Sequence, residues 1–78
     1  MLDVPTLVQW LVVVELVANG KMVPLVASEE LCRKMAREVT PGELVIGTIG
    51  GQDFQVLFQK CVRAENGVVK EVLDGRDD

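Results

Sequence analysis

The segment from Thr6 to Gly20 constrains the fold more than any other, because its two interior polar residues fit a strand better than a helix. Gln9 and Glu15 are six residues apart, so they would lie on different sides of a helix but share the odd-numbered face of a strand. The even-numbered face is then entirely apolar, with Val8, Trp10, Val12, Val14, Leu16 and Ala18. A helix that begins near Pro5 and ends at Gly20 is the alternative, and we favour the strand.

The Asn19-Gly20 dipeptide and the segment Lys21–Ala27 after it predict that this strand turns into a second one, so that Leu7–Ala27 forms a β-hairpin. Both turn residues tolerate the positive φ angles of a two-residue type I′ turn. The cross-strand pairs expected from that turn are Leu16 with Val23, Val14 with Leu25 and Val12 with Ala27, all on one apolar face. Pro24 cannot donate to a ladder, so we expect the second strand at a sheet edge.

A helix is predicted to begin after Ser28 and to end at Thr40-Pro41-Gly42. Ser28 can cap the first turn, and Glu29 and Glu30 lie beside the positive end of the helix dipole. The expected apolar stripe consists of Leu31, Cys32, Met35, Ala36 and Val39. The pairs Glu29/Arg33 and Glu30/Lys34 have the i,i+4 spacing of ion pairs on the opposite side.

Three further strands are expected, at Glu43–Ile49, Asp53–Ala64 and Val68–Leu73, with turns at Gly50-Gly51 and Asn66-Gly67. The spacing in Val68–Leu73 also suits a short helix, but valine forms strands better than helices, so we favour a strand. By alternation, the long strand turns Phe54, Val56 and Phe58 to one side and Gln55, Leu57, Gln59, Cys61 and Arg63 to the other. The turn at Asn66-Gly67 would set Val62 against Glu71.

The element order β-β-α-β-β-β predicts an α+β fold with one helix packed on a largely antiparallel sheet. A β-grasp-like arrangement and a small, partly closed barrel both fit this order. We expect residues 1–73 to form a single domain, because a chain of 78 residues supports one small core. Residues 74–78 are expected to be a flexible acidic tail.

Composition disfavours several classes of function. The formal charge is −4 and Lys and Arg form no run, which argues against nucleic acid as a partner. No apolar run could span a bilayer, so we expect no membrane association. The chain lacks histidine and its two cysteines lack a CxxC spacing, so we expect neither a metal site nor a cofactor. Without a basic segment before the N-terminal apolar stretch, we expect a cytoplasmic protein with reduced thiols.

The sequence carries no convincing catalytic grouping, and we expect a protein that is not an enzyme. Cys32 falls in the first turns of the expected helix, but without histidine it lacks the usual base, and its place on the apolar stripe predicts a buried, inert thiol. Cys61, on the mixed face of its strand, is expected to be partly exposed. The glycine-rich Gly47–Gly51 is expected to be a hairpin turn, since a phosphate-binding loop needs a helix directly after it.

The best candidate for a functional surface is the side of the first hairpin that faces away from the helix. Its apolar residues are Leu7, Leu11, Val13, Val17, Met22 and Val26. One helix covers only one face of a sheet, so these side chains would be wet unless a partner covers them. Alternatively, the C-terminal hairpin curls over these six side chains and covers them.

We therefore expect a non-catalytic protein–protein interaction module that acts as a small regulator, inhibitor or accessory subunit, a description that small stand-alone proteins of phages or mobile elements would fit. Its partner would be another protein or a second copy in a homo-oligomer, with a dimer as the simplest case. One alternative is a module that binds a small ligand or nucleic acid with Trp10, Phe54 and Phe58, beside Lys60 and Arg63. A second alternative is a thiol-dependent enzyme that uses Cys32.

Overall fold

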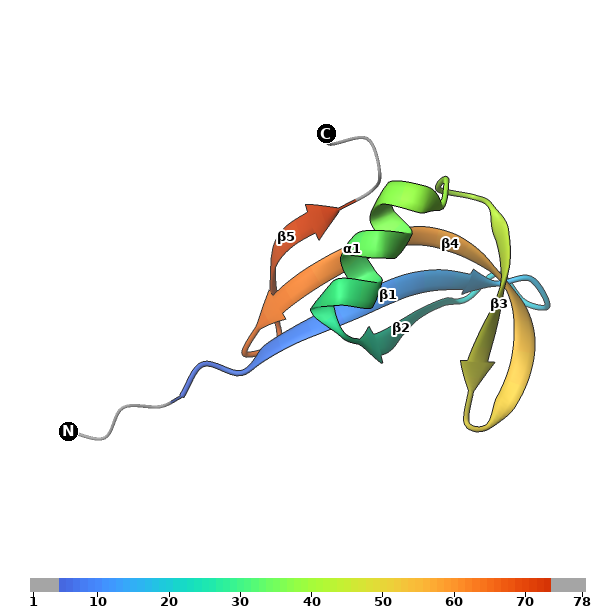
Figure 1. Ribbon diagram of the computed structural model, residues 1–78. Coiled ribbons are helices and arrows are strands. Elements are labelled where there is room, and N and C mark those ends of the chain that lie inside the picture. The colour runs from blue at the N-terminus through green and yellow to red at the C-terminus, as the bar shows by residue number, and fades with distance from the viewer. Residues whose placement is uncertain (1–4, 74–78) are drawn as a thin grey trace.

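The computed structural model describes residues 5–73, which form five strands and one helix (Figure 1). The elements are β1 (Val8–Leu16), β2 (Met22–Ala27), α1 (Glu29–Glu38), β3 (Leu44–Ile49), β4 (Gln52–Glu65) and β5 (Val68–Leu73). The predicted α+β order is confirmed, and the two segments with a helical alternative, β1 and β5, are both strands. The expected acidic tail, residues 74–78, lies outside the described residues.

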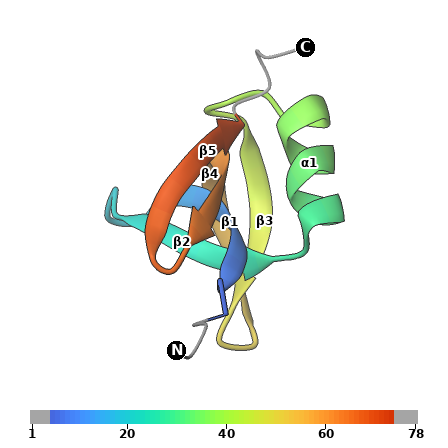
Figure 2. The ribbon, with the colours of Figure 1, turned by 90° about the vertical axis from the view of Figure 1, so that its left-hand side faces the viewer.

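The five strands form one antiparallel sheet that curls into half of a barrel, with α1 packed on its inner face (Figures 1 and 2). The strand order is β2-β1-β4-β3, and β5 also pairs with β4. Because β4 has 14 residues, its first half pairs with β3 and its second half with β5, while β1 lies along its other edge. Of the two expected arrangements, the sheet therefore adopts the partly closed barrel.

The first hairpin forms between the expected strands, but its turn is longer than predicted. Val14 pairs with Val23 and Val12 with Leu25, so the register is shifted by two residues from the prediction. The amide of Gly20 donates to the Leu16 carbonyl at 2.7 Å, closing a four-residue loop, 17–20, in which Gly20 alone has a positive φ, of 72°. A shift of two residues keeps every side chain on its predicted face.

Pro24 lies in an edge strand, as predicted, since β2 is the first strand of the sheet order. The amide of Leu16 donates to the Lys21 carbonyl at 2.8 Å, which makes these two residues a hydrogen-bonded pair. Hydrogen-bonded and non-hydrogen-bonded pairs alternate along an antiparallel ladder. The amide of Val23 therefore points toward β1, and the nitrogen of Pro24 points away from it. The proline therefore removes no bond from the ladder and blocks the free edge of the sheet.

A β-bulge in β4 overturns the predicted alternation of that strand. Val14 pairs with Phe58 and Val13 with Lys60, which leaves Gln59 as an extra residue. Beyond an extra residue the side chains change face. Val56 and Phe58 point to the inner face as expected, but Cys61 and Arg63 join them there. The predicted exposure of Cys61 is wrong, because this side chain is fully buried.

The other two hairpins turn where predicted. Gly50 and Gly51, with φ angles of 60° and 82°, form the two-residue turn between β3 and β4. Asn66 and Gly67, with φ angles of 51° and 84°, form the corresponding turn before β5. Lys70 is an extra residue in β5, so Val62 faces Val72 and the expected pairing with Glu71 is wrong.

The core lies between α1 and the inner face of the sheet. Its buried members are Val12, Val14, Cys32, Ala36, Val56, Phe58 and Cys61. The Ser28 hydroxyl caps α1 by accepting from the Leu31 amide at 3.1 Å, and Arg33 donates to Glu29 at 2.9 Å. The expected apolar stripe is narrower than predicted, since Leu31 remains 47% exposed. Among the described residues, Glu30 and Lys34 do not form the second expected ion pair.

Candidate interaction surface

The face of the sheet opposite α1, here called the outer face, is apolar across most of its width. Directly paired residues share a face, so the registers place its side chains in rows. One row crosses four strands with Val26, Leu11, Val62 and Val72. A parallel row consists of Met22, Glu15, Leu57 and Leu44. The same registers also place polar side chains on this face, at Gln9, Glu15, Thr48, Asp53, Gln55 and Lys60. Its apolar residues are therefore concentrated in the rows through Leu11 and Leu57.

All six predicted interface candidates lie on this outer face or at the two ends of its central strand. Leu7 precedes β1 and Val17 follows it, and both are exposed, as are Met22 and Val26. Leu11 and Val13, in the middle of β1, are half-buried among their neighbours. The four exposed candidates are not covered by the C-terminal hairpin, whereas Val62 and Ala64, on the same face of β4, are buried. Strand β5 extends the face with Val72 opposite Val62.

The outer face also contains four exposed apolar residues that were not among the candidates: Leu44, Ile46, Val69 and Val72. Simple alternation in β3 could have identified Leu44 and Ile46, since Val45 between them packs against the core. No such signal exists for Val69 and Val72. These residues are three apart and share a face only because Lys70 between them is a bulge.

Only two charged side chains occupy the rows that contain Leu11, Val13 and Leu57. Glu15 lies on β1 in the same row as Leu57, and Lys60 lies on β4 directly opposite Val13. Glu15 is half-buried and Lys60 is exposed. This central part of the outer face therefore carries no net charge.

A cleft of about 230 Å³ opens between β2 and β3, where the curled sheet does not close. Its walls are mostly apolar, with Leu25 and Val26 from β2, Leu31 and Met35 from α1, and Ile46 and Thr48 from β3. Val26 and Ile46 are the two most exposed large apolar side chains of the described residues, at 73% and 65%. The cleft therefore joins the outer face at its most apolar margin.

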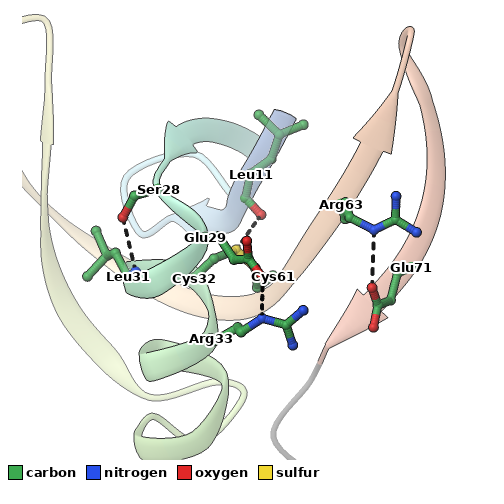
Figure 3. Close-up of a disulfide and its surroundings, with 9 residues drawn as sticks. All are labelled: Leu11, Ser28, Glu29, Leu31, Cys32, Arg33, Cys61, Arg63 and Glu71. Atoms are coloured by element: carbon green, nitrogen blue, oxygen red, sulfur yellow. Dashed lines mark hydrogen bonds and ion pairs between the residues drawn. A yellow bond between two sulfur atoms is a disulfide. The ribbon is translucent and has the colours of Figure 1, made fainter. Parts of the chain in front are cut away.

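Cys32 and Cys61 form a disulfide between α1 and β4 (Figure 3). Both side chains are fully buried, as predicted for Cys32, but the expected unpaired, reduced thiols are wrong in this structure. The Cys32 sulfur also lies 3.6 Å from the Leu11 carbonyl oxygen, to which it could donate only in the reduced form. A disulfide is typical of oxidising compartments, so it weighs against a cytoplasmic location, which stays a prediction.

Trp10 and Arg63 lie in a group of aromatic and charged side chains on the inner face. The Arg33 guanidinium lies 4.9 Å from the centre of the Trp10 ring. Arg63, paired with Trp10 across the strands, donates to Glu65 at 2.7 Å and to Glu71 at 3.2 Å. The hydrogen bond to Glu65, and then the one to Glu71, raise the pKa of Arg63 above its usual value. The guanidinium of Arg63 is thus already engaged by two carboxylates.

The three aromatic residues proposed for ligand binding do not form one platform. Phe58 is fully buried, and Phe54 is 39% exposed near the β3–β4 turn. Trp10 pairs with Arg63, nine residues farther along β4 than Phe54, which is roughly 30 Å of extended strand. Lys60 lies on the outer face, whereas Arg63 lies on the inner face.

Comparison with known protein families, with characterised proteins and with solved structures found no match for this chain. Within residues 5–73, no helix of the structure is long and apolar enough to cross a membrane. The same residues include no group of three or more potential metal ligands.

Proposed function

We propose that this protein is a non-catalytic interaction module that buries the outer face of its sheet against a protein surface. Such a module would serve as a small regulator, inhibitor or accessory subunit. The single observation that carries this proposal is the row Val26, Leu11, Val62 and Val72, which is apolar across four strands on the face opposite α1. Val26 and Val72 at its ends are exposed, Leu11 is half-buried and Val62 is buried. Contiguous apolar surface of this kind marks interaction sites in soluble proteins.

The anatomy of the face supports this reading. Exposed apolar residues from β2, β3 and β5 surround half-buried ones on β1. A partner over the rows of Leu11 and Leu57 would therefore meet mainly apolar side chains, with Glu15 and Lys60 as the charges to desolvate. The carboxylates and guanidinium groups of Glu29, Arg33, Arg63, Glu65 and Glu71 pair with one another elsewhere. They would therefore stay in water when the outer face is covered.

The test replaces one exposed residue on each face of the sheet and compares the binding of both variants. Val26→Glu places a charge on the outer face at a side chain that is 73% exposed, so the fold should tolerate it. Val68→Glu is the matched control, because Val68 is 56% exposed and pairs with Glu65 on the inner side. Circular dichroism should show both variants folded.

Proteins captured from an extract of the native host would then be purified and titrated against each variant. The proposal expects Val26→Glu to weaken binding about tenfold or more, because a buried unpaired charge is costly, while Val68→Glu leaves it unchanged. A chain that binds neither itself nor any captured protein in a way sensitive to Val26→Glu would refute the proposal.

A further inference from the structure

We propose that a second copy of this chain covers the outer face, so that two sheets pack face to face around a two-fold axis. This inference rests on the proposed function and names its partner. A two-fold contact uses the same patch on both chains, so the patch must match itself in size, polarity and charge. The outer face meets each of these requirements.

The exposed apolar area equals what one chain contributes to a stable dimer. Eight side chains of the outer face and its ends are about half exposed or more: Leu7, Val17, Met22, Val26, Leu44, Ile46, Val69 and Val72. At roughly 100 Å² each, they expose about 800 Å², the area that one partner buries in an interface of standard size. Because the sheet curls toward α1 (Figure 1), its outer face is convex, so two such faces packed about 10 Å apart would meet first along β1 and β4, with the side chains of β2, β3 and β5 around that contact.

The charges also fit a second copy. The chain carries a formal charge of −4, which would repel a copy if the acidic residues lay in the contact. Those of α1, at Glu29, Glu30 and Glu38, lie on the other side of the sheet. The central rows of the outer face contain one acid and one base, Glu15 and Lys60, on neighbouring strands. Asp53 also lies on this face, but near the β3–β4 turn and outside the central rows. If the two-fold axis passes between Glu15 and Lys60, Glu15 of each copy faces Lys60 of the other copy.

The sheet edges argue for contact through the face and against extension of the sheet. Pro24 removes a donor from the free edge of β2, and the bulge at Lys70 interrupts β5. Both features hinder a neighbouring strand from pairing along these two edges. The free edge of β3, the third edge strand, has neither a proline nor a bulge. No comparable feature keeps another molecule from packing on the outer face.

The experiment measures molar mass by light scattering and sedimentation equilibrium from micromolar to submillimolar protein concentration. Val69→Glu and Val68→Glu form a matched pair, because the two residues are adjacent in β5, 53% and 56% exposed, and on opposite faces of the sheet. We expect the wild-type chain and Val68→Glu to be dimers with similar dissociation constants. For Val69→Glu we expect the dissociation constant to rise about tenfold or more.

A pair of charge variants tests the two-fold arrangement itself. Glu15→Lys and Lys60→Glu should each weaken the homodimer, since each places like charges opposite one another. Mixed together, the two variants should form a heterodimer in which both ion pairs are restored. A mixture that associates no better than either variant alone would overturn this arrangement.

The inference and the proposed function can fail separately. A wild-type chain that is monomeric at submillimolar concentration overturns the second-copy inference. The same holds for a dimer that Val69→Glu and Val68→Glu weaken equally. The proposed function would survive either result if a captured, purified protein binds the wild-type chain and loses affinity for Val69→Glu but not for Val68→Glu.

Discussion

Cys32 on α1 and Cys61 in the middle of β4 are covalently joined, with their Cα atoms 5.6 Å apart and both side chains fully buried. This distance is typical of disulfides. The bond closes a segment that contains most of α1, the turn after it, the whole of β3 and β4 as far as Cys61. It therefore attaches the helix to the centre of the sheet in a domain whose core is small.

Reduction of this disulfide should lower the free energy of unfolding by about 3.5 kcal/mol, because a closed segment of about 30 residues restricts the unfolded chain. Urea unfolding followed by circular dichroism, with and without reductant, measures the difference. Reductant should have no effect on the double variant Cys32→Ala/Cys61→Ala, which is the control. Equal stability of the oxidised and reduced wild-type chain would contradict the prediction.

The two phenylalanines of β4 should differ strongly in their contribution to stability. Phe58 is fully buried in the core, whereas Phe54 is 39% exposed near the end of the sheet. Phe58→Ala should cost about 3–5 kcal/mol, since it removes buried apolar area and leaves a cavity. Phe54→Ala should cost less than about half as much. Chemical unfolding of both variants tests this, and similar losses would mean that Phe58 does not occupy the core as described.

Local sequence signals predicted most of the elements, because alternation, capping and turn residues act over a few positions. The faces of β1 and β2, the cap at Ser28 and the turn at Asn66-Gly67 are of this kind. They also predicted that Leu11, Val13, Met22 and Val26 share the face opposite α1. The sequence could not show that Cys61 is buried, since that depends on the bulge at Gln59, which in turn depends on how β4 pairs with β1.

The two Asn-Gly dipeptides show how pairing with a third strand overrides a local signal. Asn66 has a φ of 51° and forms the expected two-residue turn. Asn19 has no positive φ, and its dipeptide closes a four-residue loop instead. The amide of Val17 reaches the Gln55 carbonyl at 3.4 Å, so the chain continues along β4 after it has left β2. The register of the first hairpin therefore could not be read from its turn residues alone.

The same contrast predicts that alanine is tolerated at Asn19 better than at Asn66. The Asn66 side chain accepts from the Leu7 amide at 2.9 Å, and alanine would lose this bond and also strain the positive φ. We expect Asn66→Ala to cost about 2–3 kcal/mol. Asn19→Ala loses only the bond from the Lys21 amide, of 3.0 Å, and should cost about 1 kcal/mol.

Asn66→Gly separates the two contributions at this turn. Glycine adopts the positive φ without strain, so this variant should lose only the hydrogen bond to Leu7 and should lie between the wild type and Asn66→Ala in stability. Thermal unfolding of the three variants gives the order. If Asn66→Gly and Asn66→Ala are equally destabilised, the φ angle of Asn66 contributes nothing and the turn differs from the one described.

Pro24 is expected to protect the edge of the sheet and to contribute little to the fold. Its nitrogen faces outward, so Pro24→Thr should leave the ladder between β1 and β2 intact and cost only about 0.4–1 kcal/mol, from the greater freedom of the unfolded chain. The new amide would complete the free edge of β2. Pro24→Thr should therefore form higher aggregates more readily than the wild type, as followed by light scattering over time.

The neighbouring position provides the control for this edge, because Val23 donates its amide into the ladder with Val14. Val23→Pro removes that donor and should lower the free energy of unfolding by about 3 kcal/mol or more. The two variants thus reverse the usual expectation, since losing a proline promotes association and gaining one unfolds the hairpin. If Pro24→Thr destabilises the chain as much as Val23→Pro does, the nitrogen of Pro24 does not face outward and the edge of β2 is not the one described.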